Sequence, residues 1–585
     1  MTAANQPPSP AIVSQEAARR APRAVLLALC LAYVLAGFVG RGPWKGADVA
    51  SLGYMLALLE GDWPQWLAPH MLGQGADALL PHWLGALSIR ALAPLGVPAA
   101  LAARLPFALM LVGTLAATWG AVRHLALEPG AQPVAFAFGG EAAPGDYAHA
   151  LADGALLALI ATLGLAEGAH EAAPAAAQLC FAALAFYALA VQPRHDARAL
   201  VLLALALAAL ALSGAPRLAL GYAALALLGV PRQWSRRRRR RTLTALLTLA
   251  AALALLVWRL HVLRAAALAE PQWRTGAEGW LSLLRLLLWF TWPAWPLALW
   301  TLWRWRRQFF SAHRHLRLPL ALAAVPLLAA VFTTAGARTL LLALPALAAL
   351  AALALPTFSR AAAAFIDWFT VLFFTGWGIV IWVVWVAMMT GIPAKPAANV
   401  ARLAPHYTPL FQWPAFAAAV VGTGAWLALA RWRTGRHRAA LWKSLALPAG
   451  GAALCWLLLM TLWLHALDYG RCYEGQMRAV QQAMVEAGAS QPACVQVWGL
   501  GEVQLAAARV HGHWRLRAAT DEAAHCPWLL IDARVRGALP QALAGQWEEW
   551  RSVPRPADKD ESLLLLRRAA PVLAAPVEEK GRTDR

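Results

Sequence analysis

The sequence predicts an all-α polytopic membrane protein that carries a small α/β domain at its C-terminal end. Of its 585 residues, 60% are hydrophobic and only 14% are charged, and the mean hydropathy is +0.52. A soluble domain carries about 25% charged residues. Apolar runs of about 20 residues, enough for a helix to cross a bilayer, recur as far as about residue 466. After Asp468 charged residues return and the apolar runs shorten, which indicates a separate globular domain.

The strong positive charge of the chain is a topology signal in this interpretation. The formal net charge is +21, and the basic residues cluster in short loops between the apolar runs. Such clusters are typical of cytoplasmic loops in membrane proteins, so nucleic acid is not an expected partner. The run Arg236–Arg241 is interpreted as a cytoplasmic anchor that contacts anionic lipid.

The apolar runs divide into about thirteen predicted spans. They are 24–40, 100–121, 151–166, 175–192, 198–213, 217–231, 243–260, 280–303, 318–334, 338–356, 368–391, 413–430 and 444–466. The first span follows three arginines and resembles a signal peptide, but no clear small-residue cleavage site ends it. We interpret it as an uncleaved span that is preceded by a cytoplasmic tail, residues 1–23.

Four basic segments fix the predicted orientation of the transmembrane domain, residues 24–466. They are 19–23, 232–241, 304–317 and 431–443. With Met1 in the cytoplasm and the spans above, all four fall on the cytoplasmic side, as expected for positively charged loops. Three regions then lie outside: a first loop 41–98, a short turn at 167–174 and everything from residue 467.

The first outside loop places an acid beside the membrane surface. Its apolar pieces 49–59 and 79–97 are too short or too broken for spans and are typical of helices that lie in the interface or re-enter it. Asp48 lies a few residues beyond the first span, where burial is partial and neighbouring charges tune a carboxylate. It is therefore a candidate base for chemistry on a lipid carrier. The alternative is an interfacial carboxylate paired with Lys45.

The region 467–570 alternates short strands and helices, which predicts a small α/β domain. The predicted strands are 494–500, 513–518, 527–533 and 562–568, and the predicted helices are 474–488, 501–510 and 537–546. The polar end, residues 571–585, is predicted to be disordered. Cys494 and Cys526 both begin predicted strands, so we favour a disulfide between them, with Cys472 as the alternative partner.

Several short motifs follow one another through the first third of the chain. They are Trp44-Lys45-Gly46-Ala47-Asp48, Gly61-Asp62-Trp63, Leu80-Pro81-His82-Trp83-Leu84-Gly85-Ala86-Leu87 and Ala102-Ala103-Arg104-Leu105-Pro106, and Trp292-Pro293-Ala294-Trp295-Pro296-Leu297 lies further on. In order and spacing they resemble glycosyltransferase family 39 of the GT-C superfamily, which includes protein O-mannosyltransferases and lipid A aminoarabinose transferases. The thirteen-span layout is similar to the latter. The resemblance implies a GT-C type fold in a bacterial inner membrane, with the C-terminal domain in the periplasm.

The resemblance also implies a reaction. A sugar leaves a polyprenyl phosphate and joins an acceptor, while a carboxylate deprotonates or orients the acceptor and a cation stabilises the leaving phosphate. The position that matches the family's acid is Asp48. The family's Asp-Glu pair reads Asp48-Val49 here, and the place of its phosphate-binding lysine reads Ala76-Asp77-Ala78.

A second acid, Glu171, follows His170 in the short outside turn, and GT-C enzymes often present an acid from this loop. We predict that Glu171 is catalytic together with Asp48, the alternative being a polar helix cap shared with Glu167. The candidate ligands for substrate or phosphate are Lys45, His170, Arg104 and Arg338. The sequence contains no complete metal-ligand set, so it supports no metal site and no other cofactor, and a divalent metal stays open.

The predicted function is an integral membrane glycosyltransferase. It moves a sugar from a polyprenyl-phosphate donor to lipid A or another envelope glycan, with protein as the second choice of acceptor. Two alternatives stay open: a transporter or flippase of a lipid-linked molecule, and a GT-C scaffold that binds lipid-linked sugar without catalysis. Transporters tend to show internal repeats, and none is evident here. The non-catalytic scaffold stays a possible function because the family's phosphate-binding lysine and the acidic partner of Asp48 are both missing here.

Overall fold

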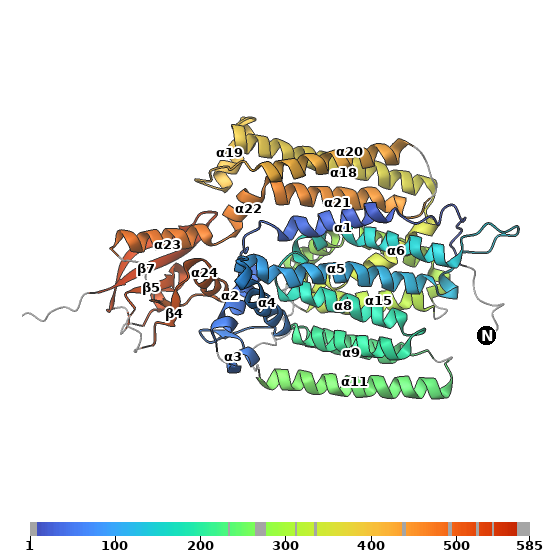
Figure 1. Cartoon of the computed structure of the whole chain (residues 1–585), viewed down its shortest axis with the longest axis horizontal. Coiled ribbons are helices and arrows are strands. Elements are labelled where there is room, and N and C mark those ends of the chain that lie inside the picture. Colours follow the sequence, from blue (N-terminus) through green and yellow to red (C-terminus); the bar gives the residue numbers. More distant parts are fainter. Residues whose placement is uncertain are drawn as a thin grey trace, which may run out of the picture. The chain divides into compact units, whose positions relative to one another are not determined.

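The computed structural model describes residues 9–61, 63–231, 234–263, 276–309, 313–332, 336–435, 440–488, 494–521, 526–540, 543 and 545–569 (Figure 1). By its internal contacts the chain divides into a helical unit, Met1–Arg471, and a C-terminal unit, Cys472–Arg585. The division follows Arg471, five residues after the predicted boundary at 466. The predicted disordered tail, 571–585, lies outside the described residues.

Long apolar helices dominate the helical unit. Among the described residues, seven helices are long and apolar enough to cross a membrane. They are α5 (Ala99–Ala126), α8 (Pro174–Val191), α11 (Arg236–Leu263), α15 (Arg314–Val331), α18 (Arg360–Thr390), α20 (Trp413–Gly435) and α21 (Lys443–Leu462). The other helices, apart from those of the first outside loop, are α1 (Arg23–Phe38), α6 (Pro144–Ala161), α7 (Leu163–Gly168), α9 (Asp196–Leu212), α10 (Pro216–Leu228), α12 (Gly276–Phe290), α13 (Ala294–Arg304), α14 (Arg306–Phe309), α16 (Gly336–Leu341), α17 (Leu344–Ala354), α19 (Ala394–Leu403) and α22 (Leu464–Arg471).

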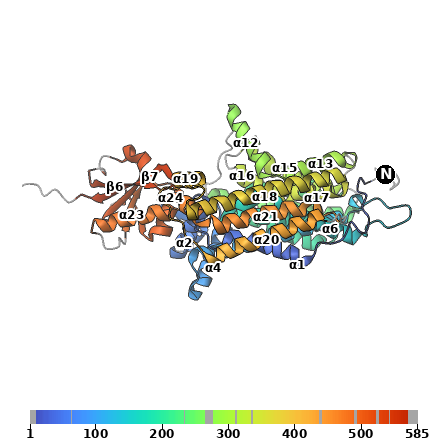
Figure 2. The ribbon, with the colours of Figure 1, turned by 90° about the horizontal axis from the view of Figure 1, so that it is seen from above.

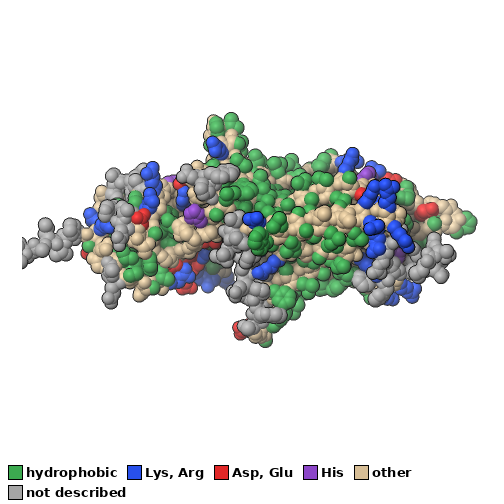
Figure 3. Space-filling model, turned by 90° about the horizontal axis from the view of Figure 1, so that it is seen from below, with side chains coloured by type: hydrophobic (Ala, Val, Ile, Leu, Met, Phe, Trp, Pro, Cys, Tyr) green, Lys and Arg blue, Asp and Glu red, His purple; other side chains and the backbone are tan. Residues whose placement is uncertain are grey.

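The helices of this unit differ in how much of their apolar surface is covered by protein. The apolar windows of α8 and α21 are each 78% buried, whereas those of α18 and α20 are 22% and 11% buried. Figure 2 shows α18 and α20 beside α21, and the two outer helices pack against it. An apolar helix satisfies its own backbone hydrogen bonds, so it can present such a surface to lipid. Figure 3 shows the opposite side of this unit, where hydrophobic side chains also cover much of the middle.

The predicted fold class is confirmed, because every predicted span coincides with a helix or with two consecutive helices. Four predicted spans are divided between two helices. Segment 151–166 divides between α6 and α7 at Thr162, and segment 444–466 divides between α21 and α22 at Trp463. The other two divide near a proline. Segment 280–303 divides into α12 and α13 around Trp292-Pro293, and segment 338–356 divides into α16 and α17, with Pro345 in the first turn of α17. Proline lacks a backbone N–H and cannot continue a preceding helix, although it fits the first turn of a new one.

The four basic segments meet at one end of the helical unit. Arg20 pairs with Asp146 at 3.0 Å, and Arg314 pairs with Glu128 at 3.6 Å. Arg238 pairs with Asp196 at 2.6 Å, and the indole of Trp442 donates to the carbonyl of Arg19 at 2.9 Å. Lys and Arg side chains gather at this end in Figure 3. The alternation of spans inferred from the sequence is therefore consistent with the structure.

The opposite end of the helical unit carries the first predicted outside loop. It contains α2 (Ala47–Glu60), α3 (Trp63–Leu67), a hairpin of β1 (His70–Met71) and β2 (Gln74–Gly75), α4 (Leu80–Leu92) and the 3-10 turn η2 (Ala93–Leu95). Helix α2 is buried along most of its length and packs against α4 and α5. The two apolar pieces expected to form short helices thus do so. Helix α2 holds its first turn, with Asp48, against the spans.

The C-terminal unit contains a five-stranded sheet with the strand order β4-β3-β5-β7-β6. Its elements are α23 (Glu474–Glu486), β3 (Cys494–Trp498), α24 (Glu502–Gly512), β4 (Arg515–Ala518), β5 (Trp528–Asp532), the 3-10 helix η5 (Ala533–Ala538), β6 (Trp547–Arg555) and β7 (Asp558–Arg568). Strand β3 is parallel to β4 and β5, and β7 is antiparallel to β5 and β6. The α/β character of this unit agrees with the sequence analysis.

The helix predicted over 537–546 falls partly outside the described residues. Within that stretch the 3-10 helix η5 ends at Ala538, Leu543 is helical, and residues 541, 542 and 544 lie outside the described set. The strand β6, which the pattern did not predict, begins at Trp547. Strand β6 has an irregular register against β7, with shifts between Glu549 and Arg551 and between Pro554 and Arg555, so its polar and apolar residues do not alternate cleanly. The favoured disulfide is present: Cys494 is bonded to Cys526.

Candidate functional site

Asp48 occupies the first turn of α2 and is 2% exposed. Gly46 precedes it with a φ of 105°, a left-handed conformation that L side chains rarely adopt. This turn points the backbone N–H of Trp44 at the Asp48 carboxylate, at 3.2 Å from Oδ2. The backbone N–H of Ala172, from the loop between α7 and α8, donates to Oδ1 at 3.0 Å. The carboxylate therefore joins the first and second loops.

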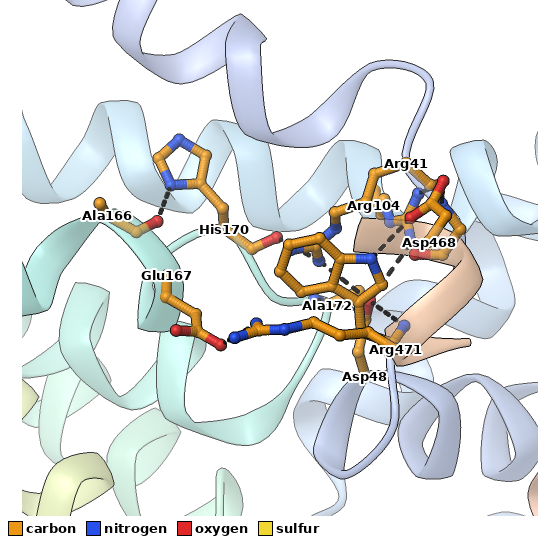
Figure 4. A network of polar contacts seen from close by, with 11 residues as sticks. Arg41, Asp48, Arg104, Ala166, Glu167, His170, Ala172, Asp468 and Arg471 are labelled. Atoms are coloured by element: carbon orange, nitrogen blue, oxygen red, sulfur yellow. Dashed lines mark hydrogen bonds and ion pairs between the residues drawn. The ribbon is translucent and has the colours of Figure 1, made fainter. Parts of the chain in front are cut away.

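Two arginines complete the surroundings of Asp48 (Figure 4). Arg41 Nη2 lies 2.9 Å from Oδ2 and also donates to the carbonyl oxygen of His170 at 2.9 Å. Arg104 Nη2, from α5, lies 3.3 Å from Oδ2 and donates to the carbonyl oxygen of Gly42 at 2.7 Å, while its Nη1 donates to the carbonyl oxygen of Arg41. The side chains of Arg41 and Arg104 are 0% and 4% exposed, so this is a buried charge cluster.

These contacts decide the protonation state of Asp48. Burial raises the pKa of its carboxyl, but Arg41, Arg104 and the two backbone N–H groups together outweigh burial and hold the pKa below its ordinary value. An anion compensated in this way is a weak proton acceptor at neutral pH. The role of general base that the sequence suggested therefore does not fit the surroundings of Asp48.

Glu171 lies next to Ala172, on the same loop, and has different surroundings. Its side chain is half-buried. Burial raises the pKa of this carboxyl to about 7, and the negative charges of Asp48 and Glu167 act in the same direction, against the positive charges of Arg41 and Arg338. A carboxylate with a pKa near neutrality is suited to accept a proton. The two acids predicted from separate loops thus lie close together, and only one has the protonation behaviour of a base.

Arg338 lies on α16, which packs against α7 and α8 on either side of the Glu171 loop. Its side chain is exposed, and its charge lowers the pKa of Glu171. Lys45 is also exposed, and its backbone N–H donates to the carbonyl oxygen of Arg471 at 2.7 Å. Arg338 is therefore an exposed cation whose charge acts on Glu171, whereas the side chains of Arg41 and Arg104 are buried.

Two predicted ligands do not fit a substrate-binding role. His170 is 0% exposed; its ring nitrogens face the carbonyl oxygens of Ala166 and Tyr33, and its ring packs against Phe38 and Trp456. Burial lowers the pKa of His170 to about 4, so the ring is neutral near pH 7.

Arg104 is likewise unsuited to bind phosphate in this arrangement. The hydrogen bonds of its guanidinium go to Asp48 and to two backbone carbonyls, and its residue is 3% exposed. The sequence could not separate these buried groups from ligands, because the motif fixes their position along the chain and not the direction of their side chains.

Sequence reasoning missed a second set of polar residues, which comes from α22. The indole N–H of Trp44 donates to Asp468 Oδ1 at 2.6 Å, and the backbone N–H of Gly42 donates to Oδ2 at 3.1 Å. Arg471 forms an ion pair with Glu167 and lies 4.6 Å from the centre of the Trp44 ring. The only available signal was the return of charged residues after the last span, which marks a boundary and does not indicate a partner.

The described residues contain no group of three or more His, Cys, Asp or Glu side chains that are placed to hold a metal ion. The ion pairs of the acids described above are with arginines.

Comparison with solved structures identifies the type of fold. No protein-family profile matches the chain, and no curated protein sequence matches it. Similar solved structures include ArnT from Cupriavidus metallidurans in the apo state, with a TM-score of 0.59, and ArnT from the same organism bound to undecaprenyl phosphate, with a TM-score of 0.55. In each comparison the sequences are 14% identical, and the alignment covers 93% of this chain and 97% of that chain. The chain is therefore a multi-pass helical protein with the GT-C type fold and a small C-terminal sheet domain.

Proposed function

We propose that this protein is an integral membrane glycosyltransferase that transfers a sugar from a polyprenyl-phosphate donor to an acceptor. The observation that carries the proposal is the convergence of two acids from separate loops at one end of a GT-C type fold, joined by the 3.0 Å hydrogen bond from the Ala172 N–H to Asp48. The undecaprenyl phosphate in a structure of ArnT supports a polyprenyl-phosphate donor. Membership of glycosyltransferase family 39 is part of this proposal.

Glu171 is the proposed base. An acceptor hydroxyl attacks the anomeric carbon of the sugar, the bond from that carbon to the phosphate oxygen breaks, and the hydroxyl proton passes to Glu171. A pKa of about 7 keeps a substantial fraction of Glu171 ionised at neutral pH and still allows it to hold the proton. Asp48 orients this loop through Ala172 and Arg41, so we assign it a positioning role.

Arg338 is the proposed cation for the leaving phosphate. The donors of a guanidinium match phosphate oxygens in pairs, and Arg338 is exposed on the helix beside Glu171. Lys45, exposed at the entrance to α2, is a second candidate for the same anion. No metal or other cofactor is part of the proposal.

We further propose that the protein lies in the inner membrane of a bacterium, with the acids and the C-terminal unit on the periplasmic side. The gathering of the four basic segments at the other end supports this orientation. Lipid A or another envelope glycan is the proposed acceptor, and the similarity to ArnT favours lipid A. Cysteine labelling of intact cells tests the orientation: a cysteine at Gly75 should react, and one placed within 234–241 should be protected.

The deciding experiment is transfer by the purified full chain in liposomes that contain lipid-linked sugars extracted from bacterial membranes, with lipid A as the acceptor. Labelled sugar should move to lipid A, and the replacement Glu171→Gln should slow the transfer by about 10²-fold or more. Movement of intact donor across the bilayer without transfer would favour a flippase. Binding of donor with neither movement nor transfer would favour a non-catalytic scaffold.

A further inference from the structure

We propose that α22 is a positioning element for this reaction and that Asp468, Arg471 and Trp44 are its positioning residues. The inference rests on the proposed function, because it explains how two loops that carry one acid each are held in a fixed relation. Helix α22 follows the last long span, α21, and contacts both loops within the helical unit. Trp44 also contacts Asp48 directly, through its backbone N–H.

The first set of contacts fixes the loop before α2. Asp468 accepts hydrogen bonds from the indole N–H of Trp44 and from the backbone N–H of Gly42. The carbonyl oxygen of Arg471 accepts a hydrogen bond from the backbone N–H of Lys45 at 2.7 Å. Three contacts over four consecutive residues leave this loop little freedom. Trp44 is 3% exposed, so loss of the hydrogen bond from its indole N–H would cost more than at an open surface.

The second set of contacts reaches the loop of Glu171. The guanidinium of Arg471 pairs with Glu167, four residues before Glu171. A third loop is held as well, because the hydroxyl of Tyr469 donates to the carbonyl oxygen of Pro405 at 2.5 Å and its ring packs on Tyr407. Figure 4 shows the Arg471 side chain reaching Glu167, with Asp468 and Asp48 on the other side of the same network. Helix α22 thus ties together loops from three distant parts of the chain.

The Trp44 ring connects α22 to the buried charge cluster around Asp48, because Arg471 and Arg41 both lie against it. Arg41 lies 4.5 Å and Arg471 lies 4.6 Å from the centre of the Trp44 ring. Arg41 in turn bridges Asp48 and the carbonyl oxygen of His170, the residue before Glu171. Loosening Trp44 should therefore let Arg41 move away from the Glu171 loop. A displacement of about 1 Å at a reacting group costs up to about 100-fold in rate.

Two variants test this inference in the full chain, each with a matched control. Trp44→Phe keeps an aromatic ring beside the two arginines and removes the N–H donor, and Asp468→Asn removes the charge. The controls are Trp413→Phe and Asp77→Asn, whose side chains are exposed. The measurements are kcat and KM for transfer from lipid-linked sugars in liposomes, the pH profile of kcat, and amide hydrogen exchange of residues 41–48 and 166–173.

The expected result is a fall in kcat of about 10- to 100-fold in both variants, with KM changed less than threefold and the controls normal. Exchange should rise in both loops. The acid limb of the pH profile should move to higher pH, because Arg41 lowers the pKa of Glu171 and its departure raises that pKa. A merely structural role would lower the amount of folded protein without moving this limb.

Other outcomes separate the inference from the proposed function. Normal kcat in Trp44→Phe and Asp468→Asn, in a protein whose wild type is active, overturns the positioning role and leaves the proposed function intact. A wild type that transfers no sugar overturns the proposed function. In that case unchanged exchange in the two variants would overturn the inference as well, whereas faster exchange in both loops would support the attachment to α22.

Discussion

Asp48 and Glu171 are neighbouring acids whose surroundings have opposite effects. Asp48 is 2% exposed, forms ion pairs with two arginines and accepts hydrogen bonds from two backbone N–H groups, so its pKa is lowered. Glu171 is half-buried, and burial together with the charge of Asp48 raises its pKa to about 7. The contrast teaches that the more conspicuous acid of a motif need not be the proton acceptor. A carboxylate whose charge is fully compensated holds its neighbours in place, and the less compensated acid beside it is free to exchange a proton.

The largest expected effect comes from removing the charge of Asp48. Asp48→Asn removes the direct ion-pair partner of the buried Arg41 and Arg104, and breaking a buried pair in this way costs about 3–5 kcal/mol. We expect a large fall in the free energy of unfolding and in the yield of folded protein, measured by thermal unfolding in detergent. Asp77→Asn, an exposed acid of the same loop, is the control and should unfold like the wild type.

Failure of this prediction would remove the distinction between Asp48 as a positioning acid and Glu171 as the base. An Asp48→Asn protein that unfolds like the wild type but has lost transfer would show that Asp48 acts on the substrate. The two acids would then have the roles that the sequence motif alone suggested.

The second effect is on catalysis rather than on stability. Glu171→Gln keeps the size of the side chain and removes the proton acceptor, so transfer should fall by about 10²-fold or more while the protein folds normally. Glu278→Gln, an exposed acid at the start of α12, is the matched control. Transfer by Glu171→Gln at the wild-type rate, measured in the same liposomes, would remove Glu171 from the mechanism.

The pH dependence sharpens the distinction between the acids. A base must be ionised to act, and the pKa of Glu171 is raised to about 7, so transfer should fall about tenfold for each pH unit below that value. Asp48, with its lowered pKa, should contribute no limb in this range. The measurement is the pH profile of kcat in the wild type, and the residual transfer of Glu171→Gln should lack this limb. A limb below pH 4 alone would indicate that an acid of ordinary pKa is the base.

The sequence predicted the fold well because its signals were long and redundant. Apolar runs of span length locate helices one by one, and four basic segments fix their alternation, so an error in one run is corrected by the others. The sequence analysis did not predict the breaks near Trp292-Pro293 and before Pro345, because each is marked only by prolines within an otherwise apolar run. Strand β6 was not predicted, because its irregular register against β7 disturbs the two-residue alternation of polar and apolar residues.

The site was predicted only in part, since a motif gives positions and not partners. Asp48 and Glu171 were identified as acids of two outside loops, and the structure brings their loops together. Arg41, Asp468 and Arg471 were missed as members of the site. Their contribution comes from contacts across 129 and 304 residues of chain, as in the bond from Arg41 to His170 and the pair of Arg471 with Glu167. No local pattern records contacts of that range.

The smallest expected effect concerns Arg338, the exposed cation beside Glu171. Arg338→Ala removes a charge from the proposed phosphate site, and we expect transfer to fall about tenfold, which corresponds to about 1.4 kcal/mol of transition-state stabilisation. Because Arg338 lowers the pKa of Glu171, its removal should raise that pKa and move the acid limb of the profile to higher pH. Arg338→Lys should restore the limb, since it restores the charge, and recover only part of the rate, since lysine lacks the paired donors of a guanidinium. Arg402→Ala, on the exposed surface of α19, is the control and should change neither quantity. An Arg338→Ala protein with the wild-type rate and a shifted limb would place Arg338 near Glu171 but outside the phosphate site, and the phosphate would then depend on Lys45 or on another cation of the same end.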